Sequence, residues 1–153
     1  MKPGQIRPIV VCIFMERDRI FVAKGLDHAK QETFYRPLGG AIEFNEQSRD
    51  CVIREIREEL NTEIKELTYV GMLENIFTFE DERGHEIVLV YKAKFADSRL
   101  YKLTSVRCPE NGGEFIAMWK PIADFKTGKA PLYPAGLLEL LDKVIDHRNS
   151  SNI

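Results

Sequence analysis

The sequence predicts an α/β domain in which helices cover the faces of a β-sheet. Apolar, β-branched segments typical of strands are spread over most of the chain. Two amphipathic helical segments, residues 46–60 and 135–147, lie far apart between and after them. The 153 residues contain no repeat or linker and are enough to bury a substantial core. We expect one domain over residues 1–148 and a frayed tail at 149–153.

The N-terminal segments favour strands and a turn. Residues 9–14 are apolar and largely β-branched, which predicts a buried strand. After a polar segment, residues 20–23 are expected to complete a hairpin with it, and residues 25–35 are expected to form a loop. The paired glycines of Pro37–Gly40 predict a tight backbone turn, because glycine adopts conformations closed to other residues.

The helix expected at residues 46–60 has one apolar face. Val52, Ile56 and Leu60 recur every four residues and form this face. Asn45 stands directly before the helix and is predicted to be its N-cap.

The second half of the chain alternates strands with polar connections. The apolar periodicity and the glycines predict two long strands joined by a turn, then an irregular loop, a short strand and a closing helix. In chain order these are the strand at 67–79, the turn at 81–84, the strand at 86–95, the loop at 97–112, the strand at 114–119 and the helix at 135–147.

Composition restricts the classes of partner. Lys and Arg total 22 and Asp and Glu total 24, so the net charge is −2, which argues against non-specific binding to nucleic acid. Cys12, Cys51 and Cys108 form no C-x-x-C pair, so neither zinc nor a disulfide framework is expected, and a reduced cytoplasm fits best. No apolar run approaches the roughly 20 residues that span a bilayer.

Three carboxylates of the first helix are predicted to share one face. Glu55, Glu58 and Glu59 are related by i, i+3 and i+4, which places them together at about 3.6 residues per turn. A solvated charged face would show the same pattern. The alternative is a site for a hard cation, since Mg²⁺ prefers oxygen ligands from carboxylates and phosphates.

The spacing around these glutamates resembles the Nudix box, G-x5-E-x7-R-E-U-x-E-E-x-G-U, where U is a bulky aliphatic residue. Seven of the nine defined positions match, namely Gly40, Glu46, Arg54, Glu55, Ile56, Glu58 and Glu59. Asn61 stands where the family has glycine, and it tolerates a left-handed backbone best after glycine. Thr62 replaces an aliphatic residue but is still β-branched.

The resemblance implies an α/β/α sandwich around a central mixed β-sheet and a MutT-like pyrophosphohydrolase activity. By the same resemblance, Glu55, Glu58 and Glu59 would bind Mg²⁺ or Mn²⁺, and the carbonyl of Gly39 or Gly40 would add a ligand. Arg54 would orient the neighbouring glutamates by salt bridges. Glu46 would support the geometry between loop and helix.

Residues outside the box would complete the site. Glu114, shortly before Trp119, is the first candidate for the general base, and Glu110 is a second one. An ordinary exposed glutamate without a catalytic role is the alternative interpretation of each. Four further residues are candidates for contacting the substrate: Glu74, Glu86, Tyr35 and Phe77. Tyr35 and Phe77 could stack on a base, and packing in the core would explain these two aromatic residues as well.

The expected function is metal-dependent hydrolysis of a diphosphate linkage in a small nucleoside diphosphate-linked substrate. Two alternatives are open: a non-catalytic nucleotide sensor of the same fold, which would be expected to lose box carboxylates, and a prenyl diphosphate isomerase of a related fold. The resemblance also leaves a homodimer open.

Overall fold

The computed structural model describes the backbone of residues 3–150 and the side chains of residues 3–146. Strands dominate this part of the chain, and helices follow the fifth, seventh and ninth strands. In chain order the elements are β1 (Ile6–Ile13), β2 (Met15–Glu16), β3 (Arg19–Asp27), β4 (Glu32–Arg36), β5 (Leu38–Ala41), α1 (Ser48–Leu60), β6 (Ile64–Phe79), β7 (Glu82–Phe95), the 3-10 helix η1 (Ser98–Tyr101), β8 (Ser105–Glu110), β9 (Gly113–Pro121), α2 (Ile122–Lys126) and α3 (Leu137–Ser150).

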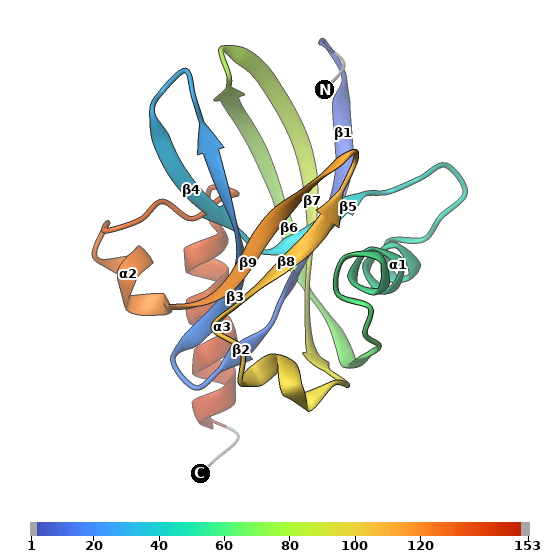
Figure 1. Cartoon of the computed structure of the whole chain (residues 1–153), viewed down its shortest axis with the longest axis vertical. Helices are drawn as coiled ribbons and strands as arrows, with labels where there is room; N and C mark the ends of the chain where they lie inside the picture. The colour runs from blue at the N-terminus through green and yellow to red at the C-terminus, as the bar shows by residue number, and fades with distance from the viewer. Residues whose placement is uncertain (1–2, 151–153) are drawn as a thin grey trace.

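The strands form two sheets between two helices (Figure 1). Sheet A has the order β5-β1-β7-β6 and is mixed, because β1 runs parallel to β7. Sheet B has the order β2-β3-β9-β8, with β4 also paired to β3, and its pairs are antiparallel. Helices α1 and α3 lie on opposite sides of the strands. The α/β class and the helix-covered architecture are confirmed, with two sheets in place of one central sheet.

The strand β1 is buried on both faces. Val10 and Cys12 belong to one core cluster, which contains the apolar face of α1. Ile9 and Val11 belong to the other, which contains the start of α3. A strand with two buried faces needs apolar residues at every position, which explains the continuous apolar run in the sequence.

The expected hairpin between residues 9–14 and 20–23 is wrong. β1 is a central strand of sheet A, with β5 on one edge and β7 on the other, so no edge is left for β3. Of the residues between β1 and β3, the two of β2 pair with β3, and beside them the N–H of Phe21 donates to the carbonyl of Phe14 at 3.0 Å. The chain therefore passes from sheet A to sheet B at this point.

Two segments expected to be loops contain strands. Residues 25–35 include the end of β3 and most of β4, and their hairpin tip is held by the buried Asp27, which accepts hydrogen bonds from the backbone N–H groups of Lys30 (3.1 Å) and Glu80 (3.3 Å). Residues 97–112 include η1 and β8. Such short polar strands are specified by pairing rather than by local pattern, so the sequence alone did not predict them.

The turn expected at Pro37–Gly40 is also wrong, because these glycines belong to β5. Gly39 pairs with Val11 and Gly40 with Val10 of β1. A Cβ on Gly39 would lie 1.9 Å from the carbonyl oxygen of Val10. Glycine is required here for close approach between strands, not for a left-handed turn.

Helix α1 begins later than expected and ends as expected. Its N-cap is Gln47, which makes no side-chain capping bond, whereas Asn45 has φ +66° in the preceding loop. At the other end Asn61 has φ 50° and ψ 43°, and its N–H donates to the carbonyl of Arg57 at 2.9 Å. The left-handed exit predicted for Asn61 is confirmed.

The C-terminal helix covers the second face of sheet A. Leu137, Leu141 and Val144 are buried in the described part of α3. Residues 149 and 150 of the expected tail are the last residues of α3, and residues 151–153 lie outside the described residues. Within the described chain, no helix is long and apolar enough to cross a membrane.

Candidate functional site

Glu55 of α1 lies directly against the backbone of β5. A Cβ on Gly40 would meet the Glu55 carboxylate oxygen at 2.3 Å, so the carboxylate occupies the space that any larger residue would fill. The Glu55 side chain is only 16% exposed, and this burial raises its pKa. Gly40 is therefore part of the site for a steric reason.

Arg54 connects the carboxylates to the loop before α1. Its guanidinium contacts both carboxylate oxygens of Glu46, at 2.6 and 3.0 Å, and Glu55 at 3.0 Å and Glu58 at 3.4 Å. It also donates to the carbonyl of Ala41 at 3.2 Å. The hydrogen bond from Arg54 lowers the pKa of Glu46 to about 2. The salt bridges expected of Arg54 are present, and Glu46 is the residue of the preceding loop to which Arg54 binds.

Glu59 holds a buried carboxylate oxygen without a partner. Its Oε2 is inaccessible to solvent and accepts no hydrogen bond. Burial, the neighbouring charge of Glu55 and the charge of Glu110 raise the pKa of Glu59 to about 8, while Arg36 opposes the shift. A buried acceptor without a partner costs free energy. The buried Oε2 of Glu59 therefore fits a positively charged ligand.

The described residues contain no group of three His, Cys, Asp or Glu side chains already arranged to hold a metal ion. Glu58 is turned toward Arg54 and is 59% exposed, so a rotation about its side-chain torsions is enough to move its carboxylate. A hard divalent cation fits the carboxylate oxygens of Glu55, Glu58 and Glu59. One of these oxygens is the buried Oε2 of Glu59, which has no hydrogen-bond partner.

The structure separates the two candidates for the general base. In β8, Cys108 packs in the cluster around α1, so Glu110, two residues on, lies on the same side of the strand, and its charge reaches Glu59. Glu114 is on the other side of β9 from Phe115 and Ala117 and contacts Arg107 at 3.2 Å. Glu114 does not lie with the carboxylate cluster.

The acidic candidates for substrate contact do not share a face either. Across β6 and β7, Asn75 lies opposite Glu86 and Glu74 opposite Ile87. Because neighbouring residues alternate between faces, Glu74 and Glu86 point to opposite sides of sheet A. Glu86 is buried and lies 3.7 Å from Arg7, whereas Glu74 is exposed.

The aromatic candidates pack away from the carboxylates. Phe77 covers Gly84, where an added Cβ would meet its ring at 2.3 Å. Tyr35 lies on the α3 side, with its ring centroid 5.9 Å from that of Phe125 and 4.9 Å from the ammonium of Lys120. These contacts place Tyr35 in the packing beneath α2.

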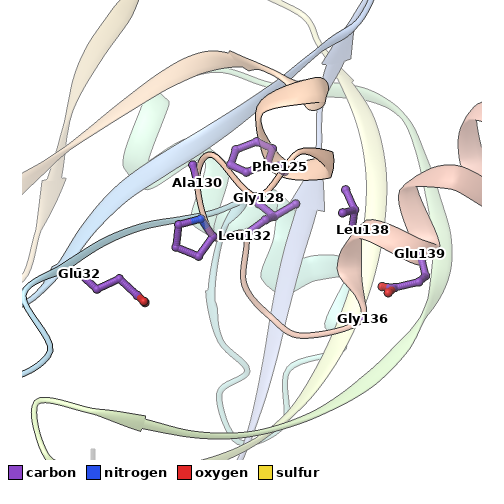
Figure 2. A pocket seen from close by; sticks show the side chains of 9 residues that line it. Glu32, Phe125, Gly128, Ala130, Leu132, Gly136, Leu138 and Glu139 are labelled. Atoms are coloured by element: carbon purple, nitrogen blue, oxygen red, sulfur yellow. The ribbon is translucent and has the colours of Figure 1, made fainter.

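A cavity of about 480 Å³ opens beside this aromatic pair, between β4, α2 and the start of α3. Figure 2 shows Glu32 and Glu139 on opposite sides of it, with the apolar side chains of Phe125, Leu132 and Leu138 between them. Two carboxylates and an apolar lining do not attract a diphosphate. This cavity is separate from the carboxylates of α1.

Sequence reasoning missed Arg36, which approaches Glu59 from β4. No local pattern marks it, because it is separated from the helix by the whole of β5 and the following loop. Only the pairing of β4 with β3 places it on the side of α1.

Comparison with curated proteins gives relatives that are longer than this chain. The NAD-capped RNA hydrolase NudC of Pseudomonas putida is 27% identical over 135 residues, which cover 86% of this chain and 41% of the relative. The protein of the same name from Pseudomonas fluorescens is 28% identical over 96 residues. The chain spans about two fifths of the Pseudomonas putida protein.

Solved structures share the fold at low sequence identity. The MutT NUDIX hydrolase of Burkholderia pseudomallei superposes with a TM-score of 0.63 at 20% identity, covering 90% of this chain and 97% of that one. A structure described as an ADP compounds hydrolase superposes with a TM-score of 0.64 at 13% identity, covering 97% of this chain and 77% of that one. The family model of the NUDIX domain matches residues 5–141. The match includes α1 with its glutamates and both sheets, and the chain belongs to the NUDIX domain family.

Proposed function

We propose that this protein hydrolyses a diphosphate linkage in a nucleoside diphosphate derivative, with Mg²⁺ or Mn²⁺ held by Glu55, Glu58 and Glu59. The observation that carries the proposal is the buried Oε2 of Glu59, which has no partner although it lies beside a second carboxylate. A divalent cation would compensate both charges. The carbonyls of Gly39 and Gly40 are further candidate ligands by family resemblance.

The glutamates of α1 and Arg54 have different roles in the proposed hydrolysis. Bound divalent ions would neutralise phosphate oxygens and lower the pKa of a water. Arg54 holds Glu55 against β5 and links the helix to the loop through Glu46, so Glu55 is in position before substrate arrives. Glu58 is exposed and can reach an incoming anion–cation pair.

Glu110 is our candidate for the general base, in place of Glu114. It is exposed at the end of β8 on the side of α1. In hydrolysis, water forms a bond to phosphorus, the bond from phosphorus to the bridging oxygen breaks, and the base takes the proton of the water. Two phosphorylated fragments leave.

The substrate class follows from the relatives and from the charge of the chain. The relatives named for NAD-capped RNA and for ADP compounds share a nucleoside linked through a diphosphate. The net charge of −2 does not favour non-specific binding to an RNA backbone. We therefore propose a free dinucleotide or sugar nucleotide as the substrate, ahead of capped RNA.

The test is a hydrolysis screen of the purified chain with Mg²⁺. NAD, ADP-ribose, nucleoside triphosphates and NAD-capped RNA would be compared, with nucleotide and phosphate products identified by chromatography. We expect turnover of at least one free diphosphate compound, and complete loss of turnover when a chelator removes the metal. Turnover that survives the chelator would contradict the metal site, and turnover of capped RNA alone would contradict the substrate class.

The same screen, with a prenyl diphosphate added to the substrates, separates the alternatives. A nucleotide sensor would bind without turnover, but this chain retains the three helix carboxylates. An isomerase would rearrange a prenyl diphosphate without releasing phosphate. Burial raises the pKa values of Cys51 and Cys108 to about 12, so neither thiol is available as a thiolate at neutral pH.

Metal affinity is expected to rise with pH. The pKa of Glu59 is raised from 4.5 to about 8 in the metal-free protein, so binding below that pH releases a proton. The apparent affinity for Mn²⁺ should increase about tenfold per pH unit and level off above pH 8. Conversely, the metal-free fold should lose stability as pH rises from 4.5 to 8, because the unfolded chain gives up this proton first.

Calorimetric Mn²⁺ titrations in buffers of different ionisation enthalpy would measure the released proton. Glu59→Gln, which carries no titrating proton, is the control and should show no release. An affinity independent of pH between 6 and 8 in the wild-type protein would contradict the assignment to Glu59.

A further inference from the structure

Arg36 provides a cation on the side of sheet B that faces the carboxylate helix α1. It is the last residue of β4, which runs into β5 in the middle of the molecule (Figure 1). Arg36 pairs with Ala23 across β4 and β3, and Ala23 packs in the same cluster as Val52 and Ile56 of α1. Because residues directly opposite in an antiparallel pair share a face, Arg36 extends toward the side of α1.

The charge of Arg36 acts on Glu59 without contact. It opposes the effect of burial on the Glu59 carboxyl, yet within the described chain Arg36 forms no salt bridge. Its side chain is exposed. Arg54, by contrast, is bound to Glu46 and Glu55. The N–H groups of the Arg36 guanidinium are therefore available to donate hydrogen bonds to a ligand.

We propose that Arg36 binds the non-bridging oxygens of the substrate's diphosphate and thereby selects diphosphates over monophosphates. The planar guanidinium of arginine presents a pair of parallel N–H donors, which match two oxygens of a phosphate. Glu110 lies on the same side of sheet B, at the end of β8 on the opposite edge, and its charge repels an anion, so the diphosphate is directed toward β4. This inference rests on the proposed function, since it assigns a role toward the substrate of the same site.

The test measures binding rather than turnover. The probes are α,β-methylene ADP, a diphosphate that resists hydrolysis between its phosphates, and AMP, each titrated with Mn²⁺ present. Arg36→Gln should weaken binding of α,β-methylene ADP at least about tenfold and affect AMP less. Arg36→Lys should restore part of the loss, because it keeps the charge without the pair of parallel donors.

Arg49→Gln is the matched control. Arg49 is also exposed, but it lies on the flank of α1 that faces β6, with Nη1 3.5 Å from the carbonyl of Leu67. This variant should bind the analogue within about twofold of wild type. Affinity for Mn²⁺ alone should not fall in Arg36→Gln, since the substitution removes a positive charge near the ligands.

The outcomes separate this inference from the proposed function. Equal binding of the analogue by wild type and Arg36→Gln would overturn the role of Arg36 even if the wild-type protein hydrolyses its substrate. Parallel losses of Mn²⁺ and analogue binding would also overturn it, because Arg36 would then support the metal site. A wild-type protein that binds the analogue through Arg36 but turns over no substrate would sustain the inference and refute the hydrolysis.

Discussion

Glu58→Gln is expected to lower kcat/KM at least about a hundredfold while leaving the fold intact. Glu58 is 59% exposed and its only described partner is Arg54 at 3.4 Å, so the loss of its charge removes little from the folded state. The amide keeps the size of the side chain but is a far poorer ligand for a hard cation. The loss should therefore fall on metal binding and on catalysis.

Glu114→Gln is the matched comparison. Glu114 is 57% exposed and is paired with an arginine, Arg107, at 3.2 Å, so the two substitutions remove similar surface ion pairs. Because Glu114 lies away from the carboxylates, activity within about twofold of wild type is expected. Steady-state kinetics with a Mn²⁺ titration would measure both variants. Full activity in Glu58→Gln would exclude the proposed metal site, and a large loss in Glu114→Gln would restore the base predicted from sequence.

The features that the sequence predicted well are local ones. The shared face of Glu55, Glu58 and Glu59 depends only on helical periodicity. The left-handed exit at Asn61 depends on the preferences of one residue, and the structure shows both. The supporting role of Glu46 was expected from the spacing of a known family, whereas its bond to Arg54, eight residues away, was not predicted.

The features that the sequence predicted poorly depend on pairing between distant strands. Glu110 and Glu114 are four residues apart across a hairpin, and which of them faces α1 is decided by the register of β8 against β9. The same holds for Glu74 and Glu86 on β6 and β7. A shift of one residue exchanges the two faces of a strand, and no local pattern in these polar segments specifies the register.

Gly39→Ala is expected to destabilise the fold by about 3 kcal/mol or more. The added Cβ would lie 1.9 Å from the carbonyl oxygen of Val10 and 2.8 Å from the Cα of Val11. These are backbone atoms of β1, one of the two central strands of sheet A, which cannot move without disturbing both cores. The clash would separate β5 from β1 and displace the loop that carries Glu46.

Two other glycines make the comparison specific. Gly113→Ala introduces a Cβ with no heavy atom within 4 Å, so its stability should change by about 0.5 kcal/mol at most. Gly40→Ala meets the end of the Glu55 side chain at 2.3 Å, which can rotate away. That variant should keep most of its stability and lose metal affinity instead.

Denaturant unfolding with parallel Mn²⁺ titrations would distinguish the three glycine variants. Equal stability of Gly39→Ala and Gly113→Ala would refute the close approach of β5 to β1, and unchanged metal affinity in Gly40→Ala would separate Glu55 from the metal.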